Sequence, residues 1–245
     1  MIQMAKELIK ASRKPVVFTG AGMSRESGMR TFRGEDGLWK QYSPEQLSSI
    51  EGLRADPETV WEWYRMRFMK SEGVKPHSGY YALTALQNEK GYLPVITQNI
   101  DGLHSEAGQV DVLEIHGSMR TASCIHRCGY SVALSRELVK NLPPVCQKCG
   151  AILRPDIVLF GEALPQDVLM RAYNLAEQCD LMLVIGTSVK VWPAAGLPFA
   201  ALDSGAKIIE INPVQTELSV SKGVISIRNN AGEILPVLAD HRQES

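Results

Sequence analysis

The stretch Gly20-Ala21-Gly22-Met23-Ser24-Arg25-Glu26-Ser27-Gly28 decides which fold this chain is expected to adopt. It follows Pro15-Val16-Val17-Phe18-Thr19, a short apolar run rich in β-branched residues, which is typical of a buried parallel strand. A strand that ends in a glycine turn and continues into a helix places free backbone N–H groups and the positive end of the helix dipole together. The sequence therefore predicts a strand, a turn and a helix start that can hold a diphosphate.

A Gly-x-Gly turn alone is a weak signal, because many such turns bind nothing. Arg25 replaces the third glycine of the dinucleotide-binding fingerprint, and no acidic residue ends a second strand about 20 residues later. This departure disfavours an ordinary dehydrogenase. The polar loop with Ser24, Ser27 and Arg33 is instead suited to cover a nucleotide as a flap.

The composition of the 245-residue chain narrows the class of protein, since 44% hydrophobic residues are enough for a sizeable core. A formal net charge of -1 gives no electrostatic footprint for nucleic acid or an anionic membrane. The first residues lack the apolar core of a signal peptide, and no apolar run approaches the ~18 residues of a membrane span. We expect a cytoplasmic protein with no nucleic-acid or membrane partner. No motif in the sequence specifies the oligomeric state, and we expect a monomer.

Short apolar runs alternate with segments of helical periodicity along most of the chain. After residues 15–19, the predicted strands are 93–97, 112–115, 157–160, 181–185 and 208–211, and the predicted helices are 2–12, 78–89, 166–178, 194–203 and 233–239. This alternation predicts an α/β fold with a doubly wound parallel (Rossmann-like) sheet, whose ligands bind at the carboxyl ends of the strands.

Two inserts interrupt the alternation. Residues 38–77 form a helical, aromatic-rich insert, and residues 118–156 form a module bounded by cysteine pairs. The remaining segments, 1–37, 78–117 and 157–245, belong to the Rossmann-like domain. Both inserts together are expected to make a smaller domain, with the ligand site in the cleft between the two domains.

Polar side chains follow two of the predicted strands. Residues 93–97 lead into Gln98-Asn99-Ile100-Asp101, and residues 112–115 lead into His116. Each group has an ordinary explanation by itself, since the first is also typical of a turn and a single histidine is often structural. Their joint position at one edge of the sheet favours a binding or catalytic site.

The cysteines form the pairs Cys124-x3-Cys128 and Cys146-x2-Cys149, each next to a turn glycine. Two such pairs can offer four thiolates in tetrahedral geometry, which indicates a zinc site. Four protein ligands leave no open position, so the zinc is expected to be structural. A zinc ribbon that binds nucleic acid is the alternative for this module, and the nearly neutral charge argues against it.

Taken together, these motifs resemble those of the sirtuins, the NAD-dependent protein deacylases, and the resemblance covers nearly the whole chain. The matching stretches are the glycine loop, Thr31-Phe32-Arg33-Gly34, Gln98-Asn99-Ile100-Asp101, His116-Gly117, Gly186-Thr187-Ser188 and Asn212. The resemblance implies that NAD is a co-substrate, that acyl-lysine proteins or peptides are the substrates, and that nicotinamide, O-acyl-ADP-ribose and deacylated lysine are the products. Where sirtuins usually have a proline and a histidine, this chain has Arg30 and Tyr80.

The same resemblance implies roles for individual residues. His116 would be the general base, Asn99 would hold the ribose and orient water, and Asp101 would bind the nicotinamide amide. The residues implied around the cofactor are Gly20, Ala21, Ser24, Phe32, Arg33, Gln98, Asn99, Ile100, Asp101, Gly186, Thr187, Ser188, Asn212, Pro213, Val214 and Ala231. The peptide would add as a strand between residues 158–162 and 189–191, through Val158, Phe160, Gly161, Glu162 and Val191.

Tyr64 and Arg67 lie three residues apart, and therefore on one helix face of the first insert. The ordinary explanation is an apolar stripe of Trp61, Tyr64 and Phe68 with a solvated arginine at its edge. However, Tyr-x-x-Arg resembles the motif with which class III sirtuins hold the carboxylate of succinyl- and malonyl-lysine. We therefore expect a deacetylase that is also a desuccinylase or demalonylase.

Two other functions remain open from the sequence. An NAD-dependent protein mono-ADP-ribosyltransferase would use the same cofactor pocket. A non-catalytic NAD or ADP-ribose binding module would also use it, but would not need His116 beside Asn99 and Asp101.

Overall fold

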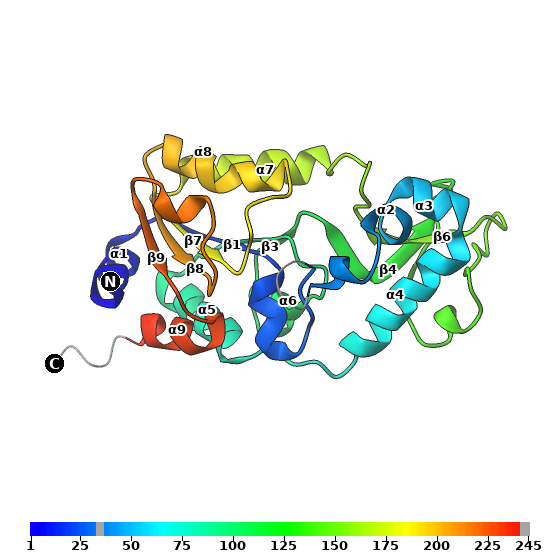
Figure 1. The fold of residues 1–245 in the computed structure, drawn as a ribbon, viewed down its shortest axis with the longest axis horizontal. Coiled ribbons are helices and arrows are strands. Elements are labelled where there is room, and N and C mark those ends of the chain that lie inside the picture. Colours follow the sequence, from blue (N-terminus) through cyan, green and yellow to red (C-terminus); the bar gives the residue numbers. More distant parts are fainter. Residues whose placement is uncertain (33–36, 241–245) are drawn as a thin grey trace.

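The computed structural model describes residues 1–32 and 37–240, and within them the chain forms two sheets and their surrounding helices (Figure 1). The strands are β1 (Pro15–Thr19), β2 (Val95–Thr97), β3 (Val112–Glu114), β4 (Gly117–Cys124), β5 (Ser131–Ala133), β6 (Leu153–Ile157), β7 (Leu181–Ile185), β8 (Lys207–Ile211) and β9 (Val224–Ile227). The α-helices are α1 (Ile2–Ala11), α2 (Pro44–Leu47), α3 (Ile50–Ala55), α4 (Pro57–Ser71), α5 (Ser78–Lys90), α6 (Leu103–Glu106), α7 (Gln166–Gln178), α8 (Leu197–Asp203) and α9 (Ala231–Ala239). Short 3-10 helices occupy Ala21–Ser27, Leu38–Lys40, Leu138–Lys140, Ala194–Gly196 and Leu218–Val220.

The larger sheet has six parallel strands in the order β3-β2-β1-β7-β8-β9. In β1 and β7 every residue is buried, which explains why both read as continuous apolar runs. The chain leaves β1 toward β2 on one side and returns as β7 on the other, so the strand order reverses between β1 and β7. In doubly wound sheets this reversal is where ligands bind, at the carboxyl ends of the strands. The predicted fold class is therefore confirmed.

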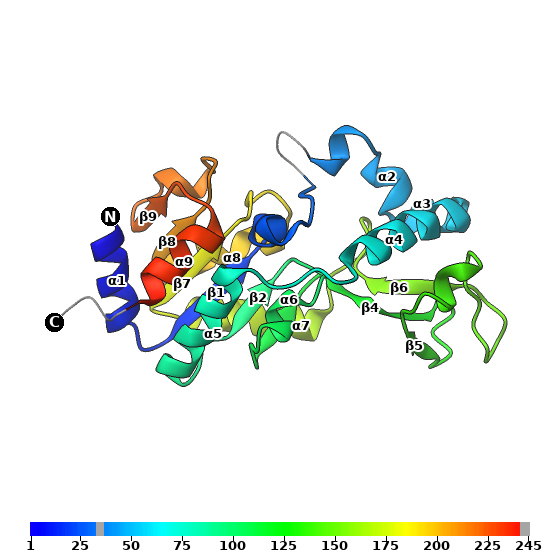
Figure 2. The ribbon, with the colours of Figure 1, turned by 90° about the horizontal axis from the view of Figure 1, so that it is seen from below.

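Helices cover both faces of this sheet (Figures 1 and 2). Helices α1, α5 and α9 pack on one face, with Ala5, Leu83 and Leu235 in the shared core. Helices α7 and α8 pack on the other face through small residues such as Ala172 and Ala201. The two faces are thus buried by helices far apart in the sequence, and only the strand ends remain open to a ligand.

A second hydrophobic core joins the two inserts. Helices α3 and α4 pack against an antiparallel sheet of order β5-β4-β6, at the end of the molecule away from both termini (Figure 2). Trp61 of α4 is fully buried, and its indole N–H donates to the carbonyl of Leu153 in β6 over 2.8 Å. Helix α4 begins at Pro57 and is capped by Asp56, whose carboxylate accepts from the Thr59 N–H.

The structure corrects one predicted strand. The strand expected at 157–160 is not part of the parallel sheet; instead β6 ends at Ile157 and belongs to the antiparallel sheet, where its residues alternate between buried and partly buried. The sixth parallel strand is β9, which the sequence did not predict. Strand β9 has four residues, a serine among them, and is mostly half-buried, so it lacks the apolar run that marks the central strands.

Helix ends also differ from the expected ones. The helix that begins in the glycine loop is a 3-10 helix, and α9 begins at Ala231, two residues before the expected start.

Among residues 1–32 and 37–240, no helix is long and apolar enough to cross a membrane.

Candidate active site

A cavity of about 820 Å³ opens at the carboxyl ends of β1, β2 and β7 and continues to the second core. Its walls come from the loops after β1, β2, β3 and β7 and from α4. Every described residue that the sequence assigned to the base, the cofactor or the acyl-peptide lines this cavity. Arg33, which was also assigned to the cofactor, lies outside the described residues. The fold thus brings the predicted residues together, while their individual roles stay predictions.

Glycines allow the loops after β1 and β7 to cross at the reversal point. A Cβ atom on Gly20 would lie 2.8 Å from the Thr187 Cβ, and one on Gly186 would lie 2.3 Å from the Met23 backbone nitrogen. Gly186 also has a positive φ of 60°. Larger residues cannot take these positions without moving the backbone, so the main chain itself forms this wall of the cavity. Such a backbone cradle fits the diphosphate of a dinucleotide.

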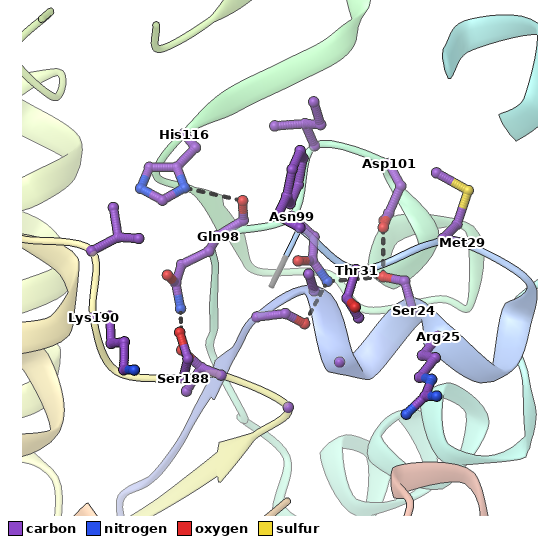
Figure 3. Close-up of a pocket in the computed structure, with 18 of the residues that line it drawn as sticks. Ser24, Arg25, Met29, Thr31, Gln98, Asn99, Asp101, His116, Ser188 and Lys190 are labelled. Carbon is purple, nitrogen blue, oxygen red and sulfur yellow. Dashed lines mark hydrogen bonds between the residues drawn. The ribbon is translucent and has the colours of Figure 1, made fainter. Parts of the chain in front are cut away.

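The side-chain amide of Asn99 is held in one orientation (Figure 3). Its Nδ2 donates to the Gly20 carbonyl over 3.0 Å and to Ser24 Oγ over 2.9 Å. Both amide protons are therefore used within the protein, and the amide oxygen is the group left for a ligand. A fixed acceptor of this kind suits a ribose hydroxyl or a water molecule.

Ser24 lies at the centre of a buried polar network beside Asn99. Its hydroxyl donates to Asp101 Oδ2 over 2.6 Å, while Asp101 Oδ1 accepts from the Leu103 N–H. Tyr80 Oη lies 2.9 Å from Ser24 Oγ. Because the single Ser24 proton goes to Asp101, Tyr80 must be the donor in that last bond. Burial raises the pKa of Asp101 and of Tyr80, so the phenol stays protonated and remains a donor.

His116 is oriented by the main chain. Its Nδ1 lies 3.1 Å from the Gln98 carbonyl oxygen, which can only accept, so Nδ1 carries the proton (Figure 3). Burial lowers the pKa of His116 below its ordinary value of 6.5, with the Gln98 carbonyl opposing that shift. The imidazole is therefore neutral at pH 7 and presents the lone pair of Nε2, as a general base requires.

The far end of the cavity combines aromatic rings with one buried cation. Tyr64 and Arg67, only 2% and 8% exposed, both line the cavity from α4. The Arg67 guanidinium lies 4.5 Å from the ring centroid of Phe32 and 5.6 Å from that of Trp63. Its Nε is buried and has no hydrogen-bond partner among the described residues. Burial lowers the pKa of Arg67, and the nearby Tyr64 and Asp101 oppose that shift without forming a salt bridge with the guanidinium.

Two loop segments flank the cavity where the sequence predicted a peptide strand. The Val158 N–H donates to the His116 carbonyl over 2.8 Å, which places this segment beside the base. Across the cavity, Val189 has a positive φ of 54°, a rare conformation for a β-branched residue. Thr187 Oγ1 accepts from the Val189 N–H and from Gln98 Nε2. Such strain persists where the surroundings fix it, and it is typical of functional sites.

The four cysteines of the two pairs come together outside the cavity. Their Sγ atoms all lie within 4.8 Å of one another, with Cys124 and Cys149 3.4 Å apart and Cys128 and Cys146 3.5 Å apart. Tetrahedral zinc with Zn–S bonds of about 2.3 Å needs sulfur atoms about 3.8 Å apart, so the cluster fits this ion. The predicted zinc ligands thus form one site that closes the tip of the antiparallel sheet, and zinc held there is structural.

The sequence did not identify several residues that line the cavity. At the far end Trp39 stacks on Phe32 and Trp63, and Ser48 lies beside Tyr64, while Trp192 lies on the wall after β7. Trp39 belongs to an aromatic-rich stretch and could have been a candidate. Ser48 carries no local signal, since it precedes a short helix like many surface serines, and only the fold places it in the cavity.

Comparisons with known proteins identify the family of this chain. The model of the Sir2 family matches residues 20–193. An NAD-dependent protein deacylase 2 of Pyrobaculum aerophilum is 45% identical over 234 residues, covering 96% of this chain and 93% of that protein. An NAD-dependent protein deacylase of Pyrococcus abyssi is 41% identical over 241 residues, covering 96% of both. The chain therefore belongs to the Sir2 family.

Solved structures share the fold. A Sir2 homologue mutant in complex with ADP ribose superposes with a TM-score of 0.91 at 42% identity, covering 98% of this chain and 95% of that one. A complex named Sir2-p53 peptide-NAD+ gives a TM-score of 0.86 at 32% identity, covering 97% of both chains. The first of these structures is a complex with ADP ribose, and the second is a complex with a p53 peptide and NAD+.

Proposed function

We propose that this NAD-dependent protein deacylase removes succinyl and malonyl groups, as well as acetyl groups, from lysine side chains. NAD is the co-substrate, and nicotinamide, O-acyl-ADP-ribose and free lysine are the products. The observation that carries the acyl specificity is Arg67, a buried cation in the cavity wall that forms no salt bridge with the described residues and whose Nε has no hydrogen-bond partner among them, although Asp101 lies near enough to interact with it.

A buried charge without a salt bridge is costly, and a pocket that served only acetyl groups would be more stable with an apolar residue at this position. The two aromatic rings beside Arg67 compensate part of this cost through cation–π contact, and they also keep water away. A carboxylate at the end of the acyl chain would supply an anion in direct contact with the guanidinium. The phenol of Tyr64, which lines the same end of the cavity, adds an uncharged donor.

The remaining roles follow from the orientation of each group. His116 lines the cavity with Nε2 unprotonated. In the acyl-transfer step it would accept a proton from a ribose hydroxyl. Asn99 would accept from the ribose or from a water molecule, and Asp101 would bind the nicotinamide amide. Phe32 would shield the reacting carbon from solvent, and the diphosphate would lie on the backbone at Gly20.

The acyl-lysine peptide would lie between residues 158–162 and 189–191 as an added strand. The relative whose structure is named Sir2-p53 peptide-NAD+ supports a peptide substrate. Backbone pairing of this kind depends little on the side chains of the peptide, so the enzyme would accept many sequences. Ordered main-chain groups on both sides, fixed by His116 and by Thr187, support this placement.

The test compares kcat/KM for succinyl, malonyl and acetyl forms of one peptide. Arg67→Met should lower the succinyl-to-acetyl ratio by about tenfold or more, since a hydrogen bond to a charged group contributes ~1.5–3 kcal/mol. Arg65→Met is the matched control, because Arg65 lies on the same helix, but its side chain is 40% exposed and pairs with Glu62. An unchanged ratio in Arg67→Met would show that Arg67 does not bind the acyl carboxylate.

A further inference from the structure

Ser48 and Tyr64 form a hydroxyl pair in the wall of the acyl end. Ser48 Oγ lies 2.6 Å from Tyr64 Oη, and both residues line the cavity. The position of Ser48 is set by the main chain, because its carbonyl accepts from the Phe160 N–H over 2.7 Å. The start of α3 is held by the same residue, because the Ile50 N–H donates to the Phe160 carbonyl over 3.1 Å. Ser48 is therefore held against Tyr64 by the segment expected to bind the peptide.

Two hydroxyl groups at this distance share one proton in the bond between them. If Tyr64 donates to Ser48, the phenol has no proton left for a ligand. If Ser48 donates to Tyr64, the phenol proton is free to point into the cavity. Burial raises the pKa of Tyr64 to about 12, so the phenol carries its proton at neutral pH in both arrangements. The direction of this one bond thus decides whether Tyr64 is a donor toward the acyl group.

The acyl group itself sets that direction. An acetyl group offers nothing that needs the phenol proton, and the hydroxyl pair is satisfied either way. A carboxylate beside Arg67 accepts hydrogen bonds only, and it favours the arrangement in which Tyr64 donates outward. A hydroxyl that accepts a hydrogen bond is a stronger donor, because successive bonds polarise one another.

We propose that Ser48 is a positioning residue for acyl specificity: its hydroxyl donates to Tyr64 Oη and directs the phenol proton to the distal carboxylate of a dicarboxylic acyl chain. This inference rests on the proposed function, in which Arg67 supplies the charge. Three side chains would then select dicarboxylic acyl groups: Tyr64 and Arg67 on α4, and Ser48 on the loop before α3. Ser48 acts through Tyr64 and needs no contact with the acyl group.

The first experiment measures kcat/KM for succinyl and acetyl forms of one peptide in Ser48→Ala and Ser48→Thr. Ser48→Ala should lower the succinyl value by about threefold to tenfold, the effect of one neutral hydrogen bond, with the acetyl value little changed. Ser48→Thr keeps the hydroxyl and should restore the ratio. Ser49→Ala is the matched control, because Ser49 lies in the same loop and its hydroxyl bonds elsewhere, accepting from the Gly52 N–H at the start of α3 and donating to the Glu45 carbonyl.

The second experiment is a double-mutant cycle with Tyr64→Phe. If Ser48 acts through Tyr64, the double variant Tyr64→Phe/Ser48→Ala should have the same succinyl-to-acetyl ratio of kcat/KM as the single variant Tyr64→Phe. An additional loss in the double variant, an unchanged ratio in Ser48→Ala, or an equal loss in Ser49→Ala would each overturn the inference. Arg67→Met keeps the two proposals apart. If that variant loses succinyl activity while Ser48→Ala does not, the proposed function stands and only the inference fails.

Discussion

Tyr80 on α5 donates to Ser24 in the glycine loop over 2.9 Å, and this bond joins a fully buried phenol to the network that holds Asp101. The Tyr80 ring packs edge-on against His77 and His104, at centroid distances of 4.9 and 4.7 Å. Tyr80 itself is not among the residues that line the cavity, and its hydroxyl acts on the site through Ser24 and lies near enough to interact with Asn99 and Asp101.

Replacing Tyr80 with phenylalanine should therefore loosen the cofactor end of the site. The substitution removes one donor from Ser24 and should cost about 1–2 kcal/mol of stability, the effect of a lost buried hydrogen bond. The KM for NAD should rise, because the Asp101 carboxylate loses part of its support. Thermal unfolding and NAD titration kinetics measure both effects.

Tyr81→Phe is the control for this variant, since Tyr81 is the next residue on α5 and is 52% exposed. If Tyr80→Phe matched Tyr81→Phe in melting temperature and in KM for NAD, the Tyr80 hydroxyl would have no part in holding the network.

His116→Ala should abolish deacylation while leaving NAD bound. Only the proton acceptor is lost, and general-base catalysis contributes roughly 10²–10⁴-fold to a rate. Lysine release from an acetyl peptide measures turnover, and calorimetric titration measures NAD binding. Added imidazole should restore part of the rate. A variant that kept more than a few per cent of the wild-type rate would remove His116 from the role of base.

His104 should make the protein labile to acid. It is buried between Thr19 and Tyr80, with Nε2 3.0 Å from Thr19 Oγ1. Thr19 Oγ1 donates its one proton to Thr97 Oγ1, so the His104 Nε2 is the donor in this bond. Burial lowers its pKa from 6.5 to about 3, with a smaller contribution from His77. The folded protein then binds fewer protons than the unfolded chain, so stability from neutral His104 is present above about pH 6.5 and is lost as the pH falls toward 3.

Denaturant unfolding at neutral and mildly acidic pH checks this prediction in wild type and in His104→Gln. Glutamine can still donate to Thr19 but does not titrate, so the variant should lose less stability on acidification. The raised pKa of Asp101 has the opposite effect on stability, which it lowers as the pH rises. This effect is the same in wild type and in His104→Gln. An equal loss in the two proteins would mean that His104 does not govern acid stability.

Removing zinc should lower the melting temperature and the activity together. The cysteine cluster closes the antiparallel sheet, and metal binding contributes directly to the folding free energy of such a module. Cys149→Ser should lower the melting temperature by several degrees, because 1 kcal/mol corresponds to about 2–4 °C in a chain of this length.

Cys179→Ser is the control for the zinc prediction. Cys179 is buried at the end of α7, where its thiol donates to the Ala176 carbonyl, and it is not part of the cluster. A metal-free protein that stayed folded and fully active would contradict a structural role for zinc.

The sequence alone determined the fold class and most of the candidate site. Buried parallel strands read as continuous apolar runs, and such strands end where glycine, asparagine or histidine follows. Because all parallel strands point the same way, residues after β1, β2, β3 and β7 must meet at one edge of the sheet. Local pattern was therefore enough to group Gly20, Asn99, His116 and Gly186.

The tertiary structure decided what local pattern does not encode. Strand β9 and the antiparallel role of β6 depend on which face each segment buries, and both segments were missed or misplaced because short, half-buried strands carry little periodicity. The pairing of Ser48 with Tyr64, and of Tyr80 with Ser24, joins side chains 16 and 56 residues apart. Such contacts are set by the packing of the two cores against the strand ends, so each hydroxyl gains its partner only in the folded chain.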